Sequence, residues 1–268
     1  MGSHLSTESI RAALIDVPSI TQVIHHASIG STNDGARQLA SDNAPEIVLI
    51  SADEQTAGRG RQGRAWFTPA GSALAISLLT RPAIAPQHAM HLTMLAGLAA
   101  VEGIEQATGL GLSLKWPNDV VSLDEGRILK VGGILTECAF RGNAIEYAIV
   151  GMGINVNVDF TSNDELRGIA TSLMHLSGQP IDRLAVLKAI VTSFVNHYDG
   201  LKSNDRLRDV WAARLMNLGR DVQVQLGGER LDGRSENVDA DGALLLRTKN
   251  GQLHRLLSGD VTLHRIDL

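Results

Sequence analysis

The sequence contains a single cysteine among 268 residues. One thiol cannot form an internal disulfide, and it cannot supply the several sulfur ligands of a multi-cysteine zinc or iron–sulfur site. Long apolar stretches are also missing, because the longest run, Met94–Val101, is far shorter than the ~20 residues that span a membrane. No basic and then apolar leader opens the chain, and we interpret residues 1–4 as the remnant of an expression tag. These absences predict a cytoplasmic protein that does not act in a membrane.

Aromatic side chains are scarce, with four Phe, three Trp and two Tyr in the whole chain. A surface that stacks the bases of a single-stranded nucleic acid is difficult to build from so few rings. The net charge of −5 is mild and offers no basic excess for phosphates. Both features argue against a dedicated nucleic-acid-binding protein.

The order of the expected elements indicates an α/β (α+β) domain with a mixed sheet and flanking helices. Short apolar, β-branched runs predict buried strands, and apolar residues at helical spacing predict helices. We expect a hydroxyl side chain to cap the helix that starts near Ser31, and Pro86 to begin the longest helix. Helices are expected at 7–16, from 31, and at 86–108, 181–200 and 204–216, and strands at 21–26, 46–52, 73–80, 112–115, 120–122, 131–140 and 145–156.

The texture of the sequence changes after Gly219. Short alternating strands, expected at 222–226, 244–247 and 261–266, predict a small all-β barrel or sandwich. We therefore divide the chain into an N-terminal tail (1–20), a catalytic domain (21–218) and a C-terminal β domain (219–268). The turns between the short strands are expected at Gly227-Gly228, Asp232-Gly233, Asp241-Gly242 and Asn250-Gly251.

The most informative segment is Gln55–Trp66, here called the arginine loop. Its glycines at 58, 60 and 63 match the dinucleotide fingerprint G-x-G-x-x-G, but a strand follows them where that fingerprint requires a helix. Arg59, Arg61 and Arg64 lie within six positions. Three guanidinium groups repel one another until an anion such as a phosphate binds them, which predicts a loop that is mobile when empty. A solvated, arginine-rich surface loop is the alternative.

Three further clusters carry polar or glycine residues near strand ends. Lys115–Asp119 (KWPND) offers a phosphate-binding cation, an amide and a carboxylate for Mg²⁺, or is a simple polar turn. Lys130–Gly133 (KVGG) places one cation before two glycines that admit a ligand close to the backbone, or is an exposed strand end. Gly151–Asn155 (GMGIN) again indicates close packing against the backbone.

In chain order, Ser31–Asn33, the arginine loop and these three clusters together resemble the biotin protein ligases, over nearly all of the chain after residue 28. The resemblance implies a core similar to that of class II aminoacyl-tRNA synthetases, followed by an SH3-like β-barrel. Many bacterial members carry an N-terminal DNA-binding domain. Only some 20 residues precede the catalytic domain here, so we expect a ligase without DNA binding.

The activity implied by the resemblance is the ATP-dependent formation of biotinyl-5′-AMP and the transfer of biotin to a lysine of a carrier protein. Biotin and ATP would be the substrates, with Mg²⁺. The partner would be the biotin carboxyl carrier protein or domain of acetyl-CoA carboxylase or a related carboxylase. A homodimer joined through sheet edges is compatible with this picture.

The resemblance also implies roles for individual residues. Lys130, Arg59 and Arg61 would be catalytic, and Asp119 would bind the metal. The residues that would contact biotin are Ser31, Thr32, Asn33, Gln55, Arg59, Gly60, Arg61, Lys130, Gly132 and Gly133. The residues that would contact ATP are Arg64, Trp66, Lys115, Asn118, Asp119 and Asn155.

Two other functions share much of this pattern. A lipoate–protein ligase would use a related adenylation site, and a biotin sensor would bind the ligand without transferring it. No enzyme nucleophile is evident, since Cys138 is expected in the core and there is no G-x-S-x-G elbow. His88 and His91, three residues apart, are interpreted as an exposed helix face and not as a metal site.

Overall fold

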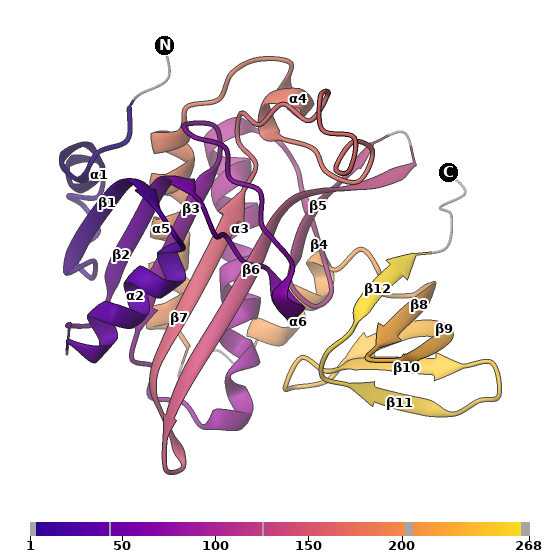
Figure 1. The fold of residues 1–268 in the computed structure, drawn as a ribbon. Coiled ribbons are helices and arrows are strands. Elements are labelled where there is room, and N and C mark those ends of the chain that lie inside the picture. The colour runs from indigo at the N-terminus through magenta and orange to yellow at the C-terminus, as the bar shows by residue number, and fades with distance from the viewer. Residues whose placement is uncertain (1–3, 43, 125, 202–205, 264–268) are drawn as a thin grey trace.

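The computed structural model describes residues 4–42, 44–124, 126–201 and 206–263. Two β-sheets organise them (Figure 1). The larger has seven strands in the order β1-β2-β3-β7-β6-β5-β4, and the smaller has five in the order β11-β10-β9-β8-β12. The strands of the larger sheet are β1 (Gln22–Ile29), β2 (Val48–Gln55), β3 (Leu74–Thr80), β4 (Ser113–Lys115), β5 (Asp119–Asp124), β6 (Arg127–Arg141) and β7 (Ala144–Ile154).

The seven-stranded sheet is mixed, as expected from the sequence. β1 and β2 run parallel, connected through α2 (Thr32–Ser41), while the other neighbouring strands pair antiparallel. Every residue of β3 is buried, because both faces of this strand are covered. Leu79 belongs to a small apolar cluster with Ala36 and Ala40 of α2, while Leu78 belongs to the main core on the opposite face.

The main core lies between the sheet and two long helices, α3 (Met90–Thr108) and α5 (Arg183–Asp199) (Figure 1). Gly103 of α3 allows the helices to approach closely, since a Cβ there would lie 2.5 Å from the backbone nitrogen of Ile190. The remaining helical elements are α1 (Thr7–Ala13), α4 (Leu173–Ser177), α6 (Leu207–Arg214) and two 3₁₀ turns, η1 (Arg61–Gly63) and η2 (Pro86–His88).

The five-stranded antiparallel sheet confirms a C-terminal all-β unit. It packs against the larger part of the molecule, since Trp116 Nε1 donates a hydrogen bond to the Gly242 carbonyl (2.9 Å) and Asn217 Nδ2 donates one to Ser235 Oγ (3.2 Å). One hydrophobic core cluster includes residues of both parts. The strands are β8 (Arg220–Leu226), β9 (Glu229–Val238), β10 (Leu244–Thr248), β11 (Leu253–Leu256) and β12 (Asp260–Leu263).

Several sequence predictions need correction. The turn predicted at Asp232-Gly233 is wrong, because both residues lie inside β9. The longest helix begins at Met90 and not at Pro86, since a separate 3₁₀ turn holds Pro86. β6 begins at Arg127, earlier than expected, and α4, β9 and β11 were not predicted. The ends of the predicted segments at 204–205 and 264–266 fall outside the described residues.

The helix predicted near Ser31 is α2, but no hydroxyl caps it. Ser31 occupies the N-cap position and makes no side-chain cap hydrogen bond.

His88 and His91 do not form an exposed helix face: their rings stack 5.0 Å apart, and His91 bonds the Ala240 carbonyl of the C-terminal unit. In the described part of the chain, we find no helix both long and apolar enough for a bilayer crossing.

Candidate functional site

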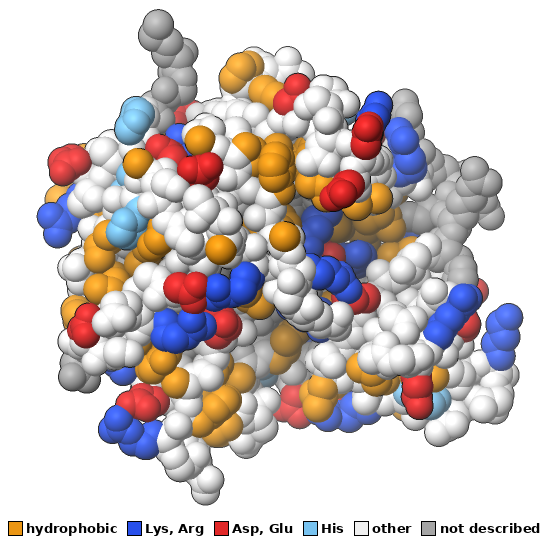
Figure 2. Space-filling view, in the orientation of Figure 1, with side chains coloured by type: hydrophobic (Ala, Val, Ile, Leu, Met, Phe, Trp, Pro, Cys, Tyr) orange, Lys and Arg blue, Asp and Glu red, His pale blue; other side chains and the backbone are white. Residues whose placement is uncertain are grey.

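A cavity of about 1110 Å³ opens beside the end of the seven-stranded sheet and reaches the C-terminal unit. Basic side chains gather at a hollow between these two parts (Figure 2). Its walls come from α2, the arginine loop, the β4–β5 turn, β6, β7, the segment 160–170 and β12. Segments far apart in the sequence therefore meet around one space.

Almost every residue singled out from the sequence lines this cavity. The exception is Gly132, where a Cβ would meet the Ile154 side chain at 2.6 Å and the Gly153 carbonyl at 2.8 Å, so its lack of a side chain serves packing within the sheet. The predicted residues that line the cavity are Ser31, Thr32, Asn33, Gln55, Arg59, Gly60, Arg61, Arg64, Trp66, Lys115, Asn118, Asp119, Lys130, Gly133 and Asn155.

One end of the cavity carries neutral hydrogen-bonding groups. The backbone N–H and the hydroxyl of Thr32 both contact Gln55 Oε1, at 2.9 and 3.1 Å. Ser77 Oγ lies 2.7 Å from Thr32 Oγ1 and 2.6 Å from Asn33 Oδ1. Ser31, Thr32, Asn33 and Ser77 are all buried. The start of α2 and the strands β2 and β3 thus supply a fixed set of hydroxyl and amide groups.

Glycines form the floor of the cavity between its neutral end and its opposite end. A Cβ at Gly151 would lie 2.3 Å from Asn33 Oδ1, and one at Gly153 would lie 2.3 Å from Trp66 Nε1. Gly133 pairs with Gly153 across the sheet and lies against Lys130. Two residues along a strand advance ~7 Å. The glycines therefore trace a path from the neutral end of the cavity toward Trp66 and Lys130.

The far end of that path is cationic. Asp119 Oδ1 lies 2.5 Å from Lys130 Nζ, and Asp119 Oδ2 lies 3.1 Å from Lys115 Nζ. Burial disfavours the charged carboxylate, but the two ammonium groups outweigh burial and hold the pKa of Asp119 below its ordinary value. Lys130 Nζ also lies 5.3 Å from the centre of the Trp66 ring, within cation–π range. One carboxylate thus fixes two cations at the cavity wall.

The amides of Asn118 and Asn155 bind protein groups. Asn118 Nδ2 donates to the Ile134 carbonyl (2.7 Å), and its Oδ1 accepts from Arg61 Nη1 (3.1 Å). Asn155 is buried and donates through Nδ2 to the carbonyls of Thr171 (3.1 Å) and Lys130 (3.4 Å). Both amides therefore position neighbouring parts of the cavity wall.

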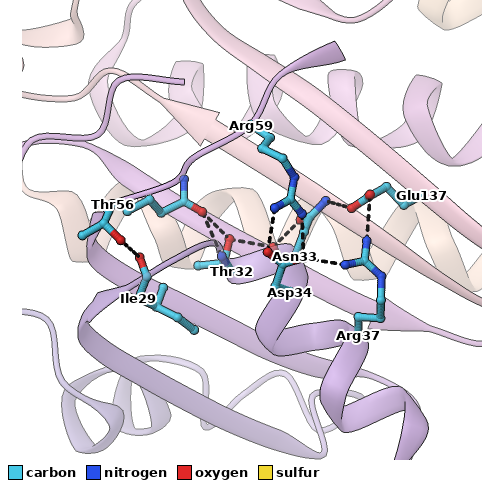
Figure 3. Close-up of polar contacts among 10 residues, drawn as sticks. Ile29, Thr32, Asn33, Asp34, Arg37, Thr56, Arg59 and Glu137 are labelled. Atoms are coloured by element: carbon cyan, nitrogen blue, oxygen red, sulfur yellow. Dashed lines mark hydrogen bonds and ion pairs between the residues drawn. The ribbon is translucent and has the colours of Figure 1, made fainter. Parts of the chain in front are cut away.

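The sequence suggested that the three arginines of the loop repel one another. In the structure, each of them has a partner on a different element. Arg59 pairs with Asp34 of α2 (Figure 3), Arg64 with Asp260 of β12, and Arg61 with Asn118 and the Gly259 carbonyl (3.3 Å). Burial lowers the pKa of the Arg61 guanidinium. The acidic partners lie far from the loop in the chain, and no local pattern indicated them.

Sequence reasoning did not identify Asp34, Ser77, Glu137 or Asp260 as parts of the site. Asp34 stands directly after the Ser31–Asn33 motif, and that adjacency was the one available hint. Ser77 lies inside a mostly apolar strand, and Glu137 lies in the long β6, where it accepts from Asn33 Nδ2 at 2.6 Å. Their roles depend on strand pairing and on no local pattern.

The surroundings of Asp119 do not suit a magnesium ligand. Both of its oxygens contact ammonium groups, and a divalent cation would have to displace them. Across the described ranges, no group of three or more His, Cys, Asp and Glu side chains is arranged to hold a metal ion. The expected role of Asp119 as a metal ligand is therefore not supported by the geometry around it.

Two family models match the chain. The Biotin/lipoate A/B protein ligase family matches residues 26–155, and the Biotin protein ligase C terminal domain matches residues 218–263. The bifunctional ligase/repressor BirA of Bacillus subtilis is 37% identical over 264 residues, which are 97% of this chain and 79% of that protein. The biotin–[acetyl-CoA-carboxylase] ligase of Paracoccus denitrificans is 32% identical, over 84% of this chain and 94% of that protein.

Solved structures agree with this relation. The biotin protein ligase from Aquifex aeolicus, in complex with biotin and ATP, superposes with a TM-score of 0.76 at 29% identity, and the match covers 92% of this chain and 100% of that one. The fold and the site thus define the class of biotin and lipoate protein ligases. Within that class, the chain belongs to the biotin protein ligase family.

Proposed function

We propose that this chain is a biotin–[acetyl-CoA-carboxylase] ligase that activates biotin with ATP and transfers it to a lysine of a carrier domain. Its relatives in Paracoccus and Aquifex support this function. The observation in this chain that supports it best is a single cavity with neutral hydrogen-bonding groups at one end and paired lysines at the other. A ligand with an uncharged polar head and a carboxylate tail fits that polarity.

In this proposal the biotin head lies at the neutral end. Its ureido ring offers one carbonyl and two N–H groups, which hydroxyl and amide side chains match. Ser31, Thr32, Asn33 and Gln55 supply these groups. The glycine floor at Gly133 lets the apolar chain pass beside the backbone. Gly132 supports this floor from within the sheet and does not contact the ligand.

The carboxylate then lies beside Lys130, where activation takes place. A carboxylate oxygen attacks the α-phosphorus of ATP, the bond from that phosphorus to pyrophosphate breaks, and biotinyl-5′-AMP forms. Lys130 has further N–H donors beyond the one that contacts Asp119, and these stabilise the negative charge that develops on the phosphate. Arg59, Gly60 and Arg61 cover this region from the arginine loop.

The nucleotide is assigned to the cationic end. Arg64, Lys115 and Trp66 line the cavity there and supply two cations and one aromatic face. Asn118, Asp119 and Asn155 act by holding Arg61, the two lysines and the Lys130 backbone in place. Mg²⁺ would enter with the ATP phosphates and would there neutralise their charge.

Transfer completes the reaction. A deprotonated lysine of the carrier domain attacks the acyl carbon of the adenylate, an amide bond forms, and AMP leaves. No nucleophile of this chain is needed. The enzyme contributes by orienting the two reactants and by keeping the anhydride out of water.

Lipoate is the less suitable substrate. Its dithiolane ring has no ureido group, so it would leave the polar groups at the neutral end without ligand partners, and such mismatches reduce turnover strongly. We expect pyrophosphate release with biotin and ATP, and little with lipoate. If pyrophosphate were released with ATP and lipoate but not with ATP and biotin, the chain would be a lipoate–protein ligase. If neither acid gave release, the chain would be a sensor that binds biotin without transferring it.

Lys130 gives the sharpest test of the proposed chemistry. Lys130→Ala should slow biotin-dependent pyrophosphate release by on the order of 100-fold or more, because it removes a donor aimed at the developing charge. Lys188→Ala is the matched control, since Lys188 of α5 makes an exposed ion pair with Asp16. The Lys188 variant should behave as the wild type. Near-normal activity of the Lys130 variant would contradict the assigned role.

A further inference from the structure

Asp34 lies in the first turn of α2, outside the motifs that the sequence analysis used. Its two oxygens accept hydrogen bonds from Nη1 and Nη2 of Arg59, each at 2.6 Å. A bidentate pair of this kind is both stronger and more directional than a single ion contact. Figure 3 shows Arg59 reaching down from the arginine loop to α2, where Asp34 meets it.

The same carboxylate separates two guanidinium groups. Arg37 Nη1 contacts Asp34 Oδ1 at 2.5 Å, while Arg37 Nη2 contacts Glu137 Oε1 at 2.8 Å. Without the charge on Asp34, Arg59 would face Arg37 with no acid between them. Arg59 would then be repelled from α2. The loop would keep the backbone bonds of Thr56 to Ile29 and of Ala57 to Gly30 at its start, but it would lose the attachment that Arg59 gives it.

This network continues into the wall of the cavity. Glu137 Oε2 accepts from Asn33 Nδ2 at 2.6 Å, and Asn33 Oδ1 accepts from Ser77 Oγ at 2.6 Å. The groups that hold Arg59 are therefore connected to those at the neutral end of the cavity (Figure 3). The position of the loop and the position of the polar end depend on the same side chains.

The loop is attached on its other side by different contacts. Within the loop, Trp66 N donates to the Gly58 carbonyl (2.9 Å) and Gly60 N donates to the Arg64 carbonyl (2.7 Å), which forms a small hairpin. Arg61 and Arg64 tie that hairpin to Gly259 and Asp260 of the C-terminal unit. Asp34 supplies the attachment of Arg59 to α2, on the opposite side of the cavity.

We propose that Asp34 is a positioning residue that holds Arg59, and with it the arginine loop, across the cavity before any ligand binds. In the ligase this attachment slows the escape of the acyl adenylate. The second statement rests on the proposed function, whereas the first is a property of the ligand-free chain.

Limited trypsin digestion tests the ligand-free property, since the loop offers cleavage sites after Arg61 and Arg64. Asp34→Asn should speed cleavage there about two- to fivefold, the size expected for losing one exposed ion pair. Asp42→Asn is the matched control, because it removes the same charge at the exposed end of the same helix. The Asp34 effect should shrink in ~0.5 M salt, which screens exposed charges.

A second arginine separates the electrostatic role from a merely structural one. Arg37→Gln in the Asp34→Asn background removes the repelling charge and should restore much of the wild-type resistance to trypsin. A merely structural role of Asp34 predicts no such rescue. Equal cleavage of wild type, Asp34→Asn and Asp42→Asn would overturn the proposal, as would a double variant that is cleaved faster than Asp34→Asn.

The catalytic consequence is measured on the same variants. With biotin and ATP, Asp34→Asn should raise the KM for biotin and the rate at which bound adenylate is lost, each about two- to fivefold, with little change in kcat. Unchanged KM and unchanged loss of adenylate would overturn the claim of retention. If the wild type releases no pyrophosphate with biotin while trypsin still distinguishes the variants, the proposed function fails and the positioning by Asp34 stands.

Discussion

At the level of single residues, Asp119 shows how one buried carboxylate can organise a cationic site. It holds Lys130 and Lys115 at 2.5 and 3.1 Å, and its side chain is only 15% exposed. Burying an isolated carboxylate at this depth costs free energy, and the two partly exposed ammonium groups offset that cost. The three charges therefore stabilise one another, and contacts within the chain fix the positions of the two lysines.

This arrangement predicts a particular response to acid. Because the pKa of Asp119 is lowered on folding, its charge contributes stability at pH values above about 4, and the contribution is lost as the pH falls further. Asp119→Asn should lower the free energy of unfolding by about 1–3 kcal/mol near neutral pH, since two partly exposed ammonium groups lose their partner. The difference from the wild type should narrow at about pH 3, as measured by urea unfolding.

The control for this experiment is Asp42→Asn, where the carboxylate is exposed and accepts 3.3 Å contacts from Gln38 Nε2. It should differ little from the wild type at either pH. A constant difference between Asp119→Asn and the wild type from neutral to acid pH would contradict the proposed charge pairing.

At the level of secondary-structure elements, Gly103 determines how closely α3 and α5 pack. A Cβ at this position would lie 2.5 and 2.6 Å from the backbone N and Cα of Ile190. No flexible side chain can move to relieve that contact, because the neighbour is helix backbone. The close approach of the two helices therefore requires glycine, although glycine is a poor helix former.

Gly103→Ala tests this packing. Alanine gains about 1 kcal/mol of helix propensity, but forcing the helices apart should cost more, so we expect a net loss of about 1–3 kcal/mol in thermal unfolding. Gly111→Ala is the control, since a Cβ added there would have no atom within 4 Å. A Gly103→Ala chain as stable as the wild type would show that the helices are free to adjust.

The strands also show how far local sequence determines the fold. Buried strands such as β3 were predicted because their apolar runs are local features of the sequence. β9 was not predicted, and a turn was expected inside it at Asp232-Gly233, because this dipeptide usually marks a turn. Here Gly233 serves strand pairing, since a Cβ would meet the Arg247 carbonyl at 2.4 Å. Only the neighbouring strand explains that glycine.

At the level of the whole molecule, the cavity needs both parts of the chain. Its lining includes Asp260, Val261 and Thr262 of β12, and the partners of Arg61 and Arg64 include groups of the same strand and the turn before it. Trp116 is fully buried and donates to the Gly242 carbonyl of the C-terminal unit. The small β unit is thus part of the wall and not a separate appendage.

For the candidate site, as for the fold, the sequence predicted the local features and missed the contacts between distant elements. Many of the polar residues that line the cavity could be identified because they lie in short motifs that resemble one family. The groups that hold them, such as Asp34 for Arg59 and Asp260 for Arg64, could not be found, because each pair joins elements distant in the chain. Local sequence therefore indicated the chemistry, and tertiary contacts determine its geometry.

The central claim is that this cavity makes biotinyl-5′-AMP and passes biotin to a carrier lysine. Intact-mass spectrometry of a biotin carboxyl carrier domain, incubated with the chain, biotin and MgATP, tests it most directly. We expect the addition of one biotinyl group, dependent on ATP and on the acceptor lysine. An unmodified carrier domain, with the chain folded and both substrates present, would contradict it.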